Sequence, residues 1–398
     1  MKNFFHKDII FSTLFIFLVM YLLKLLVFNI DFLNPIANAL KDFEFNDIYY
    51  SRLQERNPAV IDTNIIIVNI GYDSRKEIAE KIDILSKFKP AVIGLDVTFE
   101  SLKEAATDSI LSLTISRTKN LILATYFDYS EDSDEFDTYI TSDKLFRKSD
   151  NEGFINFTSS EVESTVRNFT PRISFQDEEY ISFPAKIVNS YNPSAFENLI
   201  QRNRMTEKID YKGNTESFII FDTDQINPFN RKLKIVKDKI VLMGFAGPDL
   251  NTKVLEDIHF TPLNHKYSGR SFPDMYGIFI HANIIHTILA GNYVKKIPGW
   301  ISLLLAFILT YLCMYLFISY YLKWVIWYQV IVRFLQLILS IFFVALSFFL
   351  YRIFHFQFDA VIIIVPILLS IDVMEIYEGI VLYFNKKFGY KTLFKLDK

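Results

Sequence analysis

Long apolar runs lie near both ends of the chain and enclose a long stretch of mixed sequence. One run covers residues 9–30, and three more follow at residues 300–322, 330–351 and 360–384. About 20 apolar residues in a helix are enough to cross the hydrocarbon core of a bilayer. The pattern therefore predicts one N-terminal and three C-terminal transmembrane helices. The first run is longer than the apolar part of a signal peptide and has no small-residue cleavage site after it, so we expect an uncleaved anchor.

The basic residues predict the orientation of these helices. Lysines precede the first run, and Lys323 and Arg333 flank the loop between the second and third runs, while five lysines lie in the tail at residues 385–398. Short cytoplasmic segments carry an excess of lysine and arginine. We therefore expect residues 1–8 and the basic tail to be cytoplasmic.

The enclosed residues 31–296 are then expected to form one domain on the outer side of a bacterial inner membrane, in the periplasm. Lys295 and Lys296 oppose this orientation, but charges that belong to a long translocated domain have little influence on it. We expect a helix over residues 32–61 to lead from the membrane to this domain.

The outer segment opens with the pattern of an α/β protein. Residues 64–71 read NIIIVNIG, which is typical of a strand buried on both faces, and residues 76–88 have the 3.6-residue spacing of an amphipathic helix. Pro90 ends this helix, and residues 91–97 form a second apolar run. A strand, a helix and a strand in this order predict a parallel pair joined by a right-handed crossover.

Further elements follow along the outer segment. We expect helices at Asp108–Thr118, Phe183–Leu199 and Gly277–Leu289, and strands at Asn120–Thr125 and from Lys239 onward. The fold class expected is an extracytoplasmic α/β sandwich with a mainly parallel sheet, anchored by the four transmembrane helices.

Composition removes several function classes. The chain has 398 residues and a formal net charge of -3, and the basic tail is its main basic cluster, so we expect no nucleic-acid partner. Its single cysteine, Cys313, lies inside an apolar run. The outer segment can therefore form neither a disulfide nor a cysteine-ligated metal site.

Four acids lie at or near the ends of expected strands: Asp73, Asp96, Asp222 and Asp257. Ligands of open α/β sheets bind at the carboxyl ends of the strands, so these acids can form a polar binding site there. The same residues are also common as helix caps and in turns. Both interpretations are open from the sequence.

Histidines gather in the last part of the outer segment, at positions 259, 265, 281 and 286. His281 and His286 are five residues apart, which does not place two ligands on one helical face, and no HExxH motif is present. We predict no metal, no cofactor and no catalytic residue. The residues that we predict to bind a ligand are Asp73, Asp96, Asp257, His259 and His281.

The fourth apolar run carries Asp372, Glu375 and Glu378 at steps of three, on one side of the expected helix. Ionisable groups at membrane depth are costly and are usually functional. We predict that these acids contact Arg333, Lys323 or a partner helix. The alternative is that they lie in interfacial water.

Several blocks of the outer segment, in their order, resemble a known family. They are DIYYSR at residues 47–52, IIIVNIG, PAVIGLDVTF with Asp96, Asp108, KIVLMGFAGPD, DIHFTP with Asp257, and GIFIHAN with His281. These blocks are similar to those of the extracytoplasmic type-2 CHASE sensory domain. The family's acid after the first strand is replaced by Gly71 here, and its W-P-W-x-R segment is absent apart from Arg75.

The resemblance implies a sensory domain followed by three membrane helices. Members of this family commonly continue into a histidine kinase or a nucleotide cyclase, whereas the sequence here stops shortly after Phe384. We therefore expect a stand-alone sensor in the bilayer that detects an unknown ligand or partner and acts on a separate effector protein, and that forms a homo-oligomer in some settings. A scaffold subunit of an inner-membrane complex is the alternative. A hydrolase is the third hypothesis, and it requires Asp96, Asp257 and a histidine to meet in one cleft.

Overall fold

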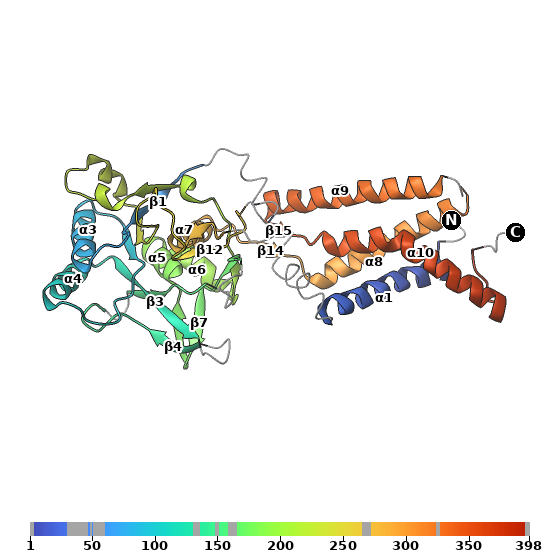
Figure 1. The fold of residues 1–398 in the computed structure, drawn as a ribbon, viewed down its shortest axis with the longest axis horizontal. Coiled ribbons are helices and arrows are strands. Elements are labelled where there is room, and N and C mark those ends of the chain that lie inside the picture. Colours follow the sequence, from blue (N-terminus) through green and yellow to red (C-terminus); the bar gives the residue numbers. More distant parts are fainter. Residues whose placement is uncertain are drawn as a thin grey trace. The chain divides into compact units, whose positions relative to one another are not determined.

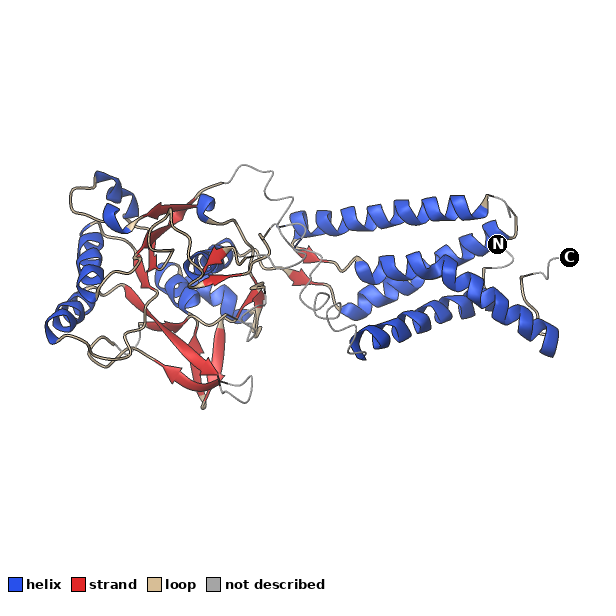
Figure 2. Cartoon of the chain, viewed as in Figure 1, coloured by secondary structure: helices blue, strands red, loops and turns tan. Residues whose placement is uncertain are grey.

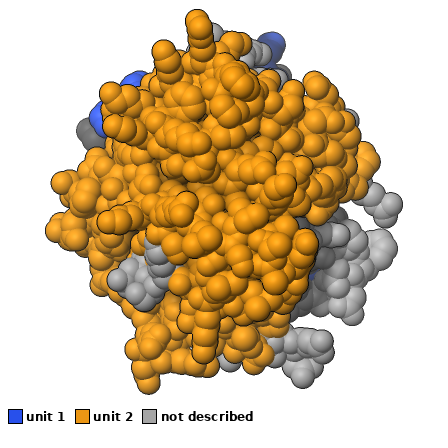
Figure 3. Space-filling view, turned by 90° about the vertical axis from the view of Figure 1, so that its left-hand side faces the viewer, with its two compact units in different colours: residues 1–46, 294–398 blue, residues 47–293 orange. Residues whose placement is uncertain are grey.

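The computed structural model describes residues 4–29, 47, 50, 60–129, 136–147, 151–157, 165–264, 272–323 and 327–394. The chain divides into two compact units, which Figure 3 colours separately. Residues 47–293 form the outer domain, and residues 1–46 with 294–398 form the membrane unit. The helix expected over residues 32–61 lies almost entirely outside the described residues.

A seven-stranded sheet forms the centre of the outer domain, with the order β10-β1-β11-β2-β3-β4 and with β5 beside β3. All of its pairings are parallel except that of β3 with β4. The strands are β1 (Asp62–Asn69), β2 (Val92–Leu95), β3 (Leu121–Tyr129), β4 (Phe136–Ile140), β5 (Glu152–Phe154), β10 (Phe218–Phe221) and β11 (Ile240–Gly244). The predicted α/β class with a mainly parallel sheet is confirmed.

The predicted pairing of the first two strands is wrong in one respect. Strands β1 and β2 run parallel, but β11 lies between them, because Ile240 pairs with Ile65 of β1 on one side and with Val92 of β2 on the other. A strand-helix-strand pattern predicts the crossover and its hand, but it carries no information about a strand that arrives later in the chain and inserts.

Helices cover both faces of this sheet (Figures 1 and 2). One face carries α3 (Arg75–Lys87) and α4 (Ala105–Arg117), and the other carries α5 (Phe183–Tyr191) and α7 (Gly277–Ala290), with α6 (Pro193–Gln201) packed against these two. Helix α3 begins with a capping box in which Ser74 and Glu77 each accept a backbone N–H of the other. Helix α7 ends at Gly291, which has the left-handed conformation of a helix C-terminus.

The single helix expected over Phe183–Leu199 is two helices in the structure. Asn192 separates α5 from α6, and its side chain accepts a hydrogen bond from the backbone N–H of Ala195 at 3.2 Å. Pro193 follows as the first residue of α6, where its missing N–H costs nothing. An apolar periodicity that continues across this point concealed the break.

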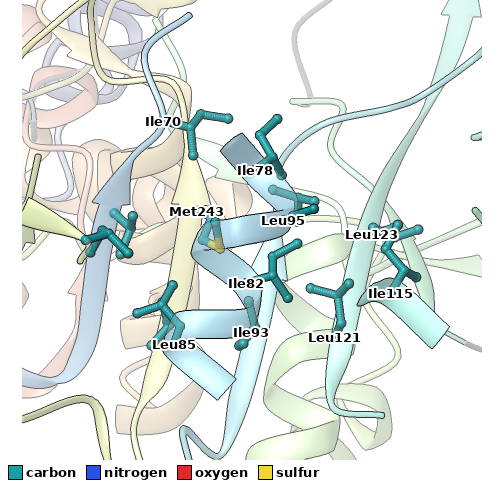
Figure 4. Close-up of a cluster of buried hydrophobic side chains, with 14 of the residues drawn as sticks. Ile70, Ile78, Ile82, Leu85, Ile93, Leu95, Ile115, Leu121, Leu123 and Met243 are labelled. Atoms are coloured by element: carbon teal, nitrogen blue, oxygen red, sulfur yellow. The ribbon is translucent and has the colours of Figure 1, made fainter. Parts of the chain in front are cut away.

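The face under α3 and α4 is an apolar core (Figure 4). Residues of β10, β1, β11, β2 and β3 point into it, among them Ile93, Leu95 and Met243, and they meet Ile82 and Leu85 of α3. All five side chains are fully buried. Burial of each such side chain contributes about 1.5–3 kcal/mol, so this face supplies much of the stability of the outer domain.

Short two-stranded sheets and 3₁₀ turns complete the outer domain. The strand pairs are β6 (Asn168–Phe169) with β9 (Glu207–Lys208), β7 (Arg172–Phe175) with β8 (Glu178–Ile181), and β12 (Ile258–His259) with β13 (Met275–Tyr276). The 3₁₀ turns are Thr215–Ser217, Thr223–Gln225 and Arg231–Val236.

In its described residues, the membrane unit consists of four helices and a short parallel pair of strands. The helices are α1 (Lys7–Asn29), α8 (Gly299–Tyr321), α9 (Tyr328–Phe354) and α10 (Val361–Phe388), and the strands are β14 (Lys295–Lys296) and β15 (Phe356–Gln357). Within the described part of the chain, three helices are long and apolar enough to cross a membrane, in α1, α8 and α9. Helix α10 is equally long but carries the three acids, and its membrane crossing stays a prediction.

Candidate functional site

Four of the five predicted ligand-binding residues lie together at the carboxyl end of the central sheet. Asp96 directly follows β2, and its carboxylate Oδ2 lies 3.9 Å from Nε2 of His281 on α7. Asp257 and His259 flank the start of β12, and their Oδ1 and Nε2 atoms are 3.3 Å apart. We call these four residues the strand-end cluster. The fold therefore joins residues that are up to 185 positions apart in the sequence.

Two glycines let helix α7 approach the end of the sheet. A Cβ atom on Gly244, the last residue of β11, would lie 2.7 Å from Ile278 of α7 and 3.1 Å from the Cβ of Asp96. A Cβ atom on Gly277, the first residue of α7, would lie 3.0 Å from both carboxylate oxygens of Asp257. The carboxylate of Asp257 thus lies at the N-terminus of α7, where the helix dipole favours negative charge.

Burial controls the protonation of the two inner residues of the strand-end cluster. The side chains of Asp96 and His281 are only 9% and 3% exposed. Burial, together with the nearby charge of Asp257, raises the pKa of Asp96 to about 8. Burial, together with His259, lowers the pKa of His281 to about 3. At neutral pH the pair is therefore a carboxylic acid beside a neutral imidazole, and the 3.9 Å separation is too long for a hydrogen bond.

Aromatic rings enclose the two histidines of the strand-end cluster. The ring of Phe157 stacks on His281 with centroids 4.9 Å apart, and its edge meets His259 at 5.0 Å. Phe183 of α5 covers a further side of His281 at 5.6 Å. Among the described residues, Nδ1 of His281 has no hydrogen-bond partner although it is buried. A buried polar atom without a partner costs about 1–3 kcal/mol, so its presence points to a role other than stability.

Asp73 lies apart from the strand-end cluster. Its carboxylate forms an ion pair with Lys81 of α3, and both side chains are almost completely buried. Burial raises the pKa of Asp73, and the hydrogen bond from Lys81 acts in the opposite direction. Asp73 thus joins the loop before α3 to the second turn of that helix.

Asn69, which the sequence reasoning did not select, organises the end of the sheet beside the strand-end cluster. Its side chain is fully buried and makes four hydrogen bonds. Nδ2 donates to Asp222 and to the carbonyl oxygen of Gly247, while Oδ1 accepts from the backbone N–H groups of Gly71 and Ala246. The fourth strand-end acid, Asp222, is therefore part of this network. A single polar residue near the end of the apolar run IIIVNIG was the available signal.

Asp47 and Asp108, which belong to the sequence blocks that resemble the known family, form ion pairs in the outer domain. Arg75 of α3 donates to Asp108 of α4 at 2.5 Å, and Asp47 accepts from Arg167 at 2.6 Å. Both pairs have side chains that are less than 12% exposed. The first pair joins the two helices that cover the apolar face.

The remaining histidines have other partners or lie outside the described residues. Nδ1 of His286 lies 2.7 Å from Oδ2 of Asp62 at the start of β1. The five-residue spacing places His286 and His281 on different sides of α7. His265 falls in a range that the structure does not describe. Across the part of the chain that is described, no group of three or more His, Cys, Asp or Glu side chains could hold a metal ion.

A pocket of about 640 Å³ lies next to the strand-end cluster. Its lining comes from the ends of β3 and β4, from β7 and from the segment that follows α6, and it includes Phe157. None of the four cluster residues lines this pocket. Phe157 therefore belongs to both sites: its ring contacts His259 and His281, and it also lines the pocket. The arrangement that the hydrolase hypothesis requires, with the acids and a histidine in one cleft, is absent from this pocket.

The three acids of α10 lie against neighbouring helices of the membrane unit. Asp372 forms an ion pair with Arg333 of α9 at 2.7 Å, and both side chains remain more than half exposed. Glu378 accepts a hydrogen bond from the hydroxyl of Tyr321 at 2.8 Å, and Glu375 lies 3.5 Å from the amide nitrogen of Gln329.

Asp8, at the start of α1, joins the two ends of the membrane unit. Its buried carboxylate accepts hydrogen bonds from the hydroxyls of Tyr377, Tyr390 and Thr392 and from the backbone N–H of Leu393, at 2.6–3.2 Å. The beginning of α1 and the segment after α10 are therefore in contact within this unit. No sequence pattern indicated a role for this residue.

The fold and the apolar helices define the protein as a membrane protein that carries an α/β domain. Residues 19–318 match the model of the CHASE2 domain, and the chain belongs to this family of extracytoplasmic sensory domains. The match confirms the resemblance of the sequence blocks. No curated protein and no solved structure shows a significant match to the chain.

Proposed function

We propose that this protein is a sensor of the bacterial inner membrane, whose periplasmic domain detects a ligand or partner and which acts on a separate effector protein. The observation that carries the proposal is the strand-end cluster. The side chains of Asp96 and His281 are almost completely buried and have strongly displaced pKa values. They lie at the carboxyl ends of the strands, where α/β folds bind ligands. Such groups destabilise the fold, and a binding role explains their presence.

We propose binding rather than catalysis at the strand-end cluster. A catalytic acid or base must reach its substrate within hydrogen-bond distance, but the rings of Phe157 and Phe183 enclose His281, and the side chain of Asp96 is only 9% exposed. Asp257 and His259 form the partly exposed side of the cluster, and the ring of Phe157 connects His259 to the adjacent pocket. The adjacent pocket also favours ligand detection over the scaffold alternative, for which an extended apolar surface would be expected.

The contacts of Asp8 support cytoplasmic locations for both termini. Because Asp8 bonds the segment after α10, the N-terminal end of α1 and the end of α10 belong on the same side of the membrane. If α1, α8 and α9 each cross the membrane, a crossing by α10 returns the chain to that side, which supports the predicted fourth span. The positive-inside rule then assigns this side to the cytoplasm.

The acids of α10 support an interaction with a separate protein. Asp372 and Arg333 are more than half exposed on helices of the membrane unit, where ionisable groups are costly unless they are covered. A partner helix with polar side chains would cover them. A ligand changes the state of such a device only by its different affinity for two conformations, so the effector must respond to a change in the helices.

Crosslinking in intact membranes, followed by affinity purification of the full-length protein in mild detergent, tests the proposal. We expect a specific partner in the crosslinked fraction. A chain that is recovered alone, with and without crosslinking, would refute action on a separate protein.

A charge-swapped pair provides the matched control. The single variant Asp372→Arg is expected to lose the partner, because it repels Arg333 and removes the exposed carboxylate. The double variant Asp372→Arg with Arg333→Asp restores the intrachain ion pair. If the double variant recovers the partner fully, Asp372 acts only within this chain. If the partner is still lost, the carboxylate at position 372 contacts the partner.

A further inference from the structure

The pocket that Phe157 lines has two arginines in its lining, and its wall is more apolar than polar. Its apolar wall consists of Tyr129, Phe136, Phe157, Ile173 and Met205, and the arginines are at positions 172 and 204. Its volume of about 640 Å³ lies within the range of about 300–1,000 Å³ that is usual for small-molecule sites. A small organic molecule therefore fits this space.

The two arginines differ in how firmly they are held. Arg172 donates to Asn203 at 2.5 Å and pairs with Glu179 at 2.9 Å, so its guanidinium is fixed in place. Arg204 is 47% exposed, and among the described residues its acidic neighbour is Glu207, 3.9 Å away. Glu207 is already bound to Arg202 at 2.6 Å, in a pair that is tighter. Arg204 thus has donors to offer to a further anion.

The charge balance of the pocket is positive. Two guanidinium groups face a single carboxylate, that of Glu179, among the residues that line it. Guanidinium groups recognise carboxylates and phosphates through paired hydrogen bonds, which are stronger than those between neutral groups. The aromatic walls favour a ligand with an apolar body, because the rings of Phe136 and Tyr129 pack together in a tilted arrangement with their centroids 4.9 Å apart.

We propose that this pocket binds an organic anion with an apolar or aromatic body, such as an aromatic carboxylate, with Arg204 and Arg172 as its charge partners. The proposal rests on the proposed function, since the pocket is the place where the sensor takes its ligand. Phe157 joins the two sites: a ligand that contacts its ring in the pocket acts on the ring that stacks on His281 and His259.

A fluorescent label at the rim of the pocket tests the proposal in the full-length protein. Met205 is 87% exposed and lines the pocket, and the single native cysteine, Cys313, is buried in α8, so Met205→Cys gives one reactive label position. The probes are indole-3-acetate, its uncharged amide and inorganic phosphate. A label at Phe229→Cys, which is 90% exposed and outside the pocket, reports non-specific effects.

We expect a saturable signal with indole-3-acetate at position 205 and none at position 229. The amide is expected to bind about tenfold more weakly, the effect of one lost charge-assisted contact. Phosphate alone is expected to bind more weakly than the indole acid, because it lacks an apolar body. Because Arg172 remains, Arg204→Gln should reduce the preference for the acid over the amide, whereas the exposed control Arg231→Gln should keep it in full.

Equal affinities for acid and amide would overturn the proposal, as would an unchanged preference in Arg204→Gln or the absence of a saturable signal with any probe. Each of these results is independent of the crosslinking result. If no probe binds the pocket but a partner is crosslinked, the pocket proposal is refuted and the sensor proposal is not. If indole-3-acetate binds the pocket but no partner is crosslinked, only the action on a separate effector is refuted.

Discussion

The two faces of the central sheet are built from the same strands but have opposite chemistry. The face under α3 and α4 is mainly apolar, with residues such as Ile93, Leu95 and Met243 at its core. Its buried charges are paired, Lys81 with Asp73 and Arg75 with Asp108. The face under α5 and α7 receives the alternate residues of the same strands, including Gly94 and Gly244. It ends in the polar side chains of Asn69 and His281, which are buried, and of Asp96, which is 9% exposed.

Under the proposed function, this difference separates stability from ligand detection within one sheet. The apolar face gains stability from close packing, which needs no particular chemistry beyond size and shape. The polar face gives up stability, because it buries an acid and a histidine that are not paired by a hydrogen bond. We therefore expect substitutions on the first face to affect folding, and substitutions on the second face to affect pH response and signalling.

The largest effect is expected from truncation on the apolar face. Leu95→Ala removes a fully buried side chain and should lower the free energy of unfolding by about 2–5 kcal/mol. Native-state hydrogen exchange of the β2 and β11 amides in the full-length protein measures this change. Ile110→Ala, at a position of α4 that is 42% exposed, is the control and should change stability by less than about 0.5 kcal/mol. Equal effects of the two variants would contradict the assignment of this face as the main core.

A smaller loss of unfolding free energy than that of Leu95→Ala is expected for a substitution at Asn69. Asn69→Ala leaves the backbone groups of Gly71, Ala246 and Gly247 without their side-chain partner, and we expect a loss of about 2–3 kcal/mol. The same exchange experiment measures it, with the amides of Gly71 and Ala246 as direct reporters. If those amides keep their protection, the hydrogen bonds of Asn69 do not hold the end of the sheet.

The pH-dependent change in the free energy of unfolding that arises from the polar face should be equal to or smaller than the effect of Asn69→Ala. The folded pKa of Asp96 is about 8, above its unfolded value, so its contribution to stability is full at acid pH and is lost as the pH rises to about 8. The folded pKa of His281 is about 3, below its unfolded value of 6.5, so its contribution is full above that value and is lost as the pH falls. The two effects oppose each other below pH 6.5.

Between pH 6.5 and 8 only the loss at Asp96 should remain. We expect the stability of Asp96→Asn relative to the wild type to rise by about 1.4 kcal/mol per pH unit, or about 2 kcal/mol across this window. The difference between the two proteins removes the contributions of Glu152 and Asp274, whose pKa values burial also raises, to about 7 and about 6. A constant difference across the window would show that Asp96 is ionised in the folded protein.

Much of the fold could be predicted from local sequence patterns. The helix expected over residues 76–88 is observed at Arg75–Lys87, because its apolar spacing and the Ser74 cap are both local signals. The insertion of β11 between β1 and β2 could not be predicted, since strand order depends on contacts between distant segments. The division of the helix at Asn192 has a local signal, the Asn-Pro sequence, which the surrounding apolar pattern concealed.

The polar site could be predicted only in part. The carboxyl-end rule identified Asp96 and Asp257, and it also selected Asp73, which pairs with Lys81 instead. Phe157 lies outside any periodic segment, and its contact with His281 depends on the folding of a loop over the sheet. Residues of this kind become visible only when tertiary structure brings loops and helices together.

The most direct test of a sensor asks whether a change at the polar face alters the partner. The full-length wild type, Asp96→Asn and Leu95→Ala are expressed at equal levels, and the crosslinked partner is quantified for each from intact membranes. We expect Asp96→Asn to change the partner yield at least about twofold without loss of folded protein, the size of a modest coupling free energy. Leu95→Ala should change the yield only in proportion to the folded fraction. An unchanged yield in Asp96→Asn would contradict the account and would favour a scaffold.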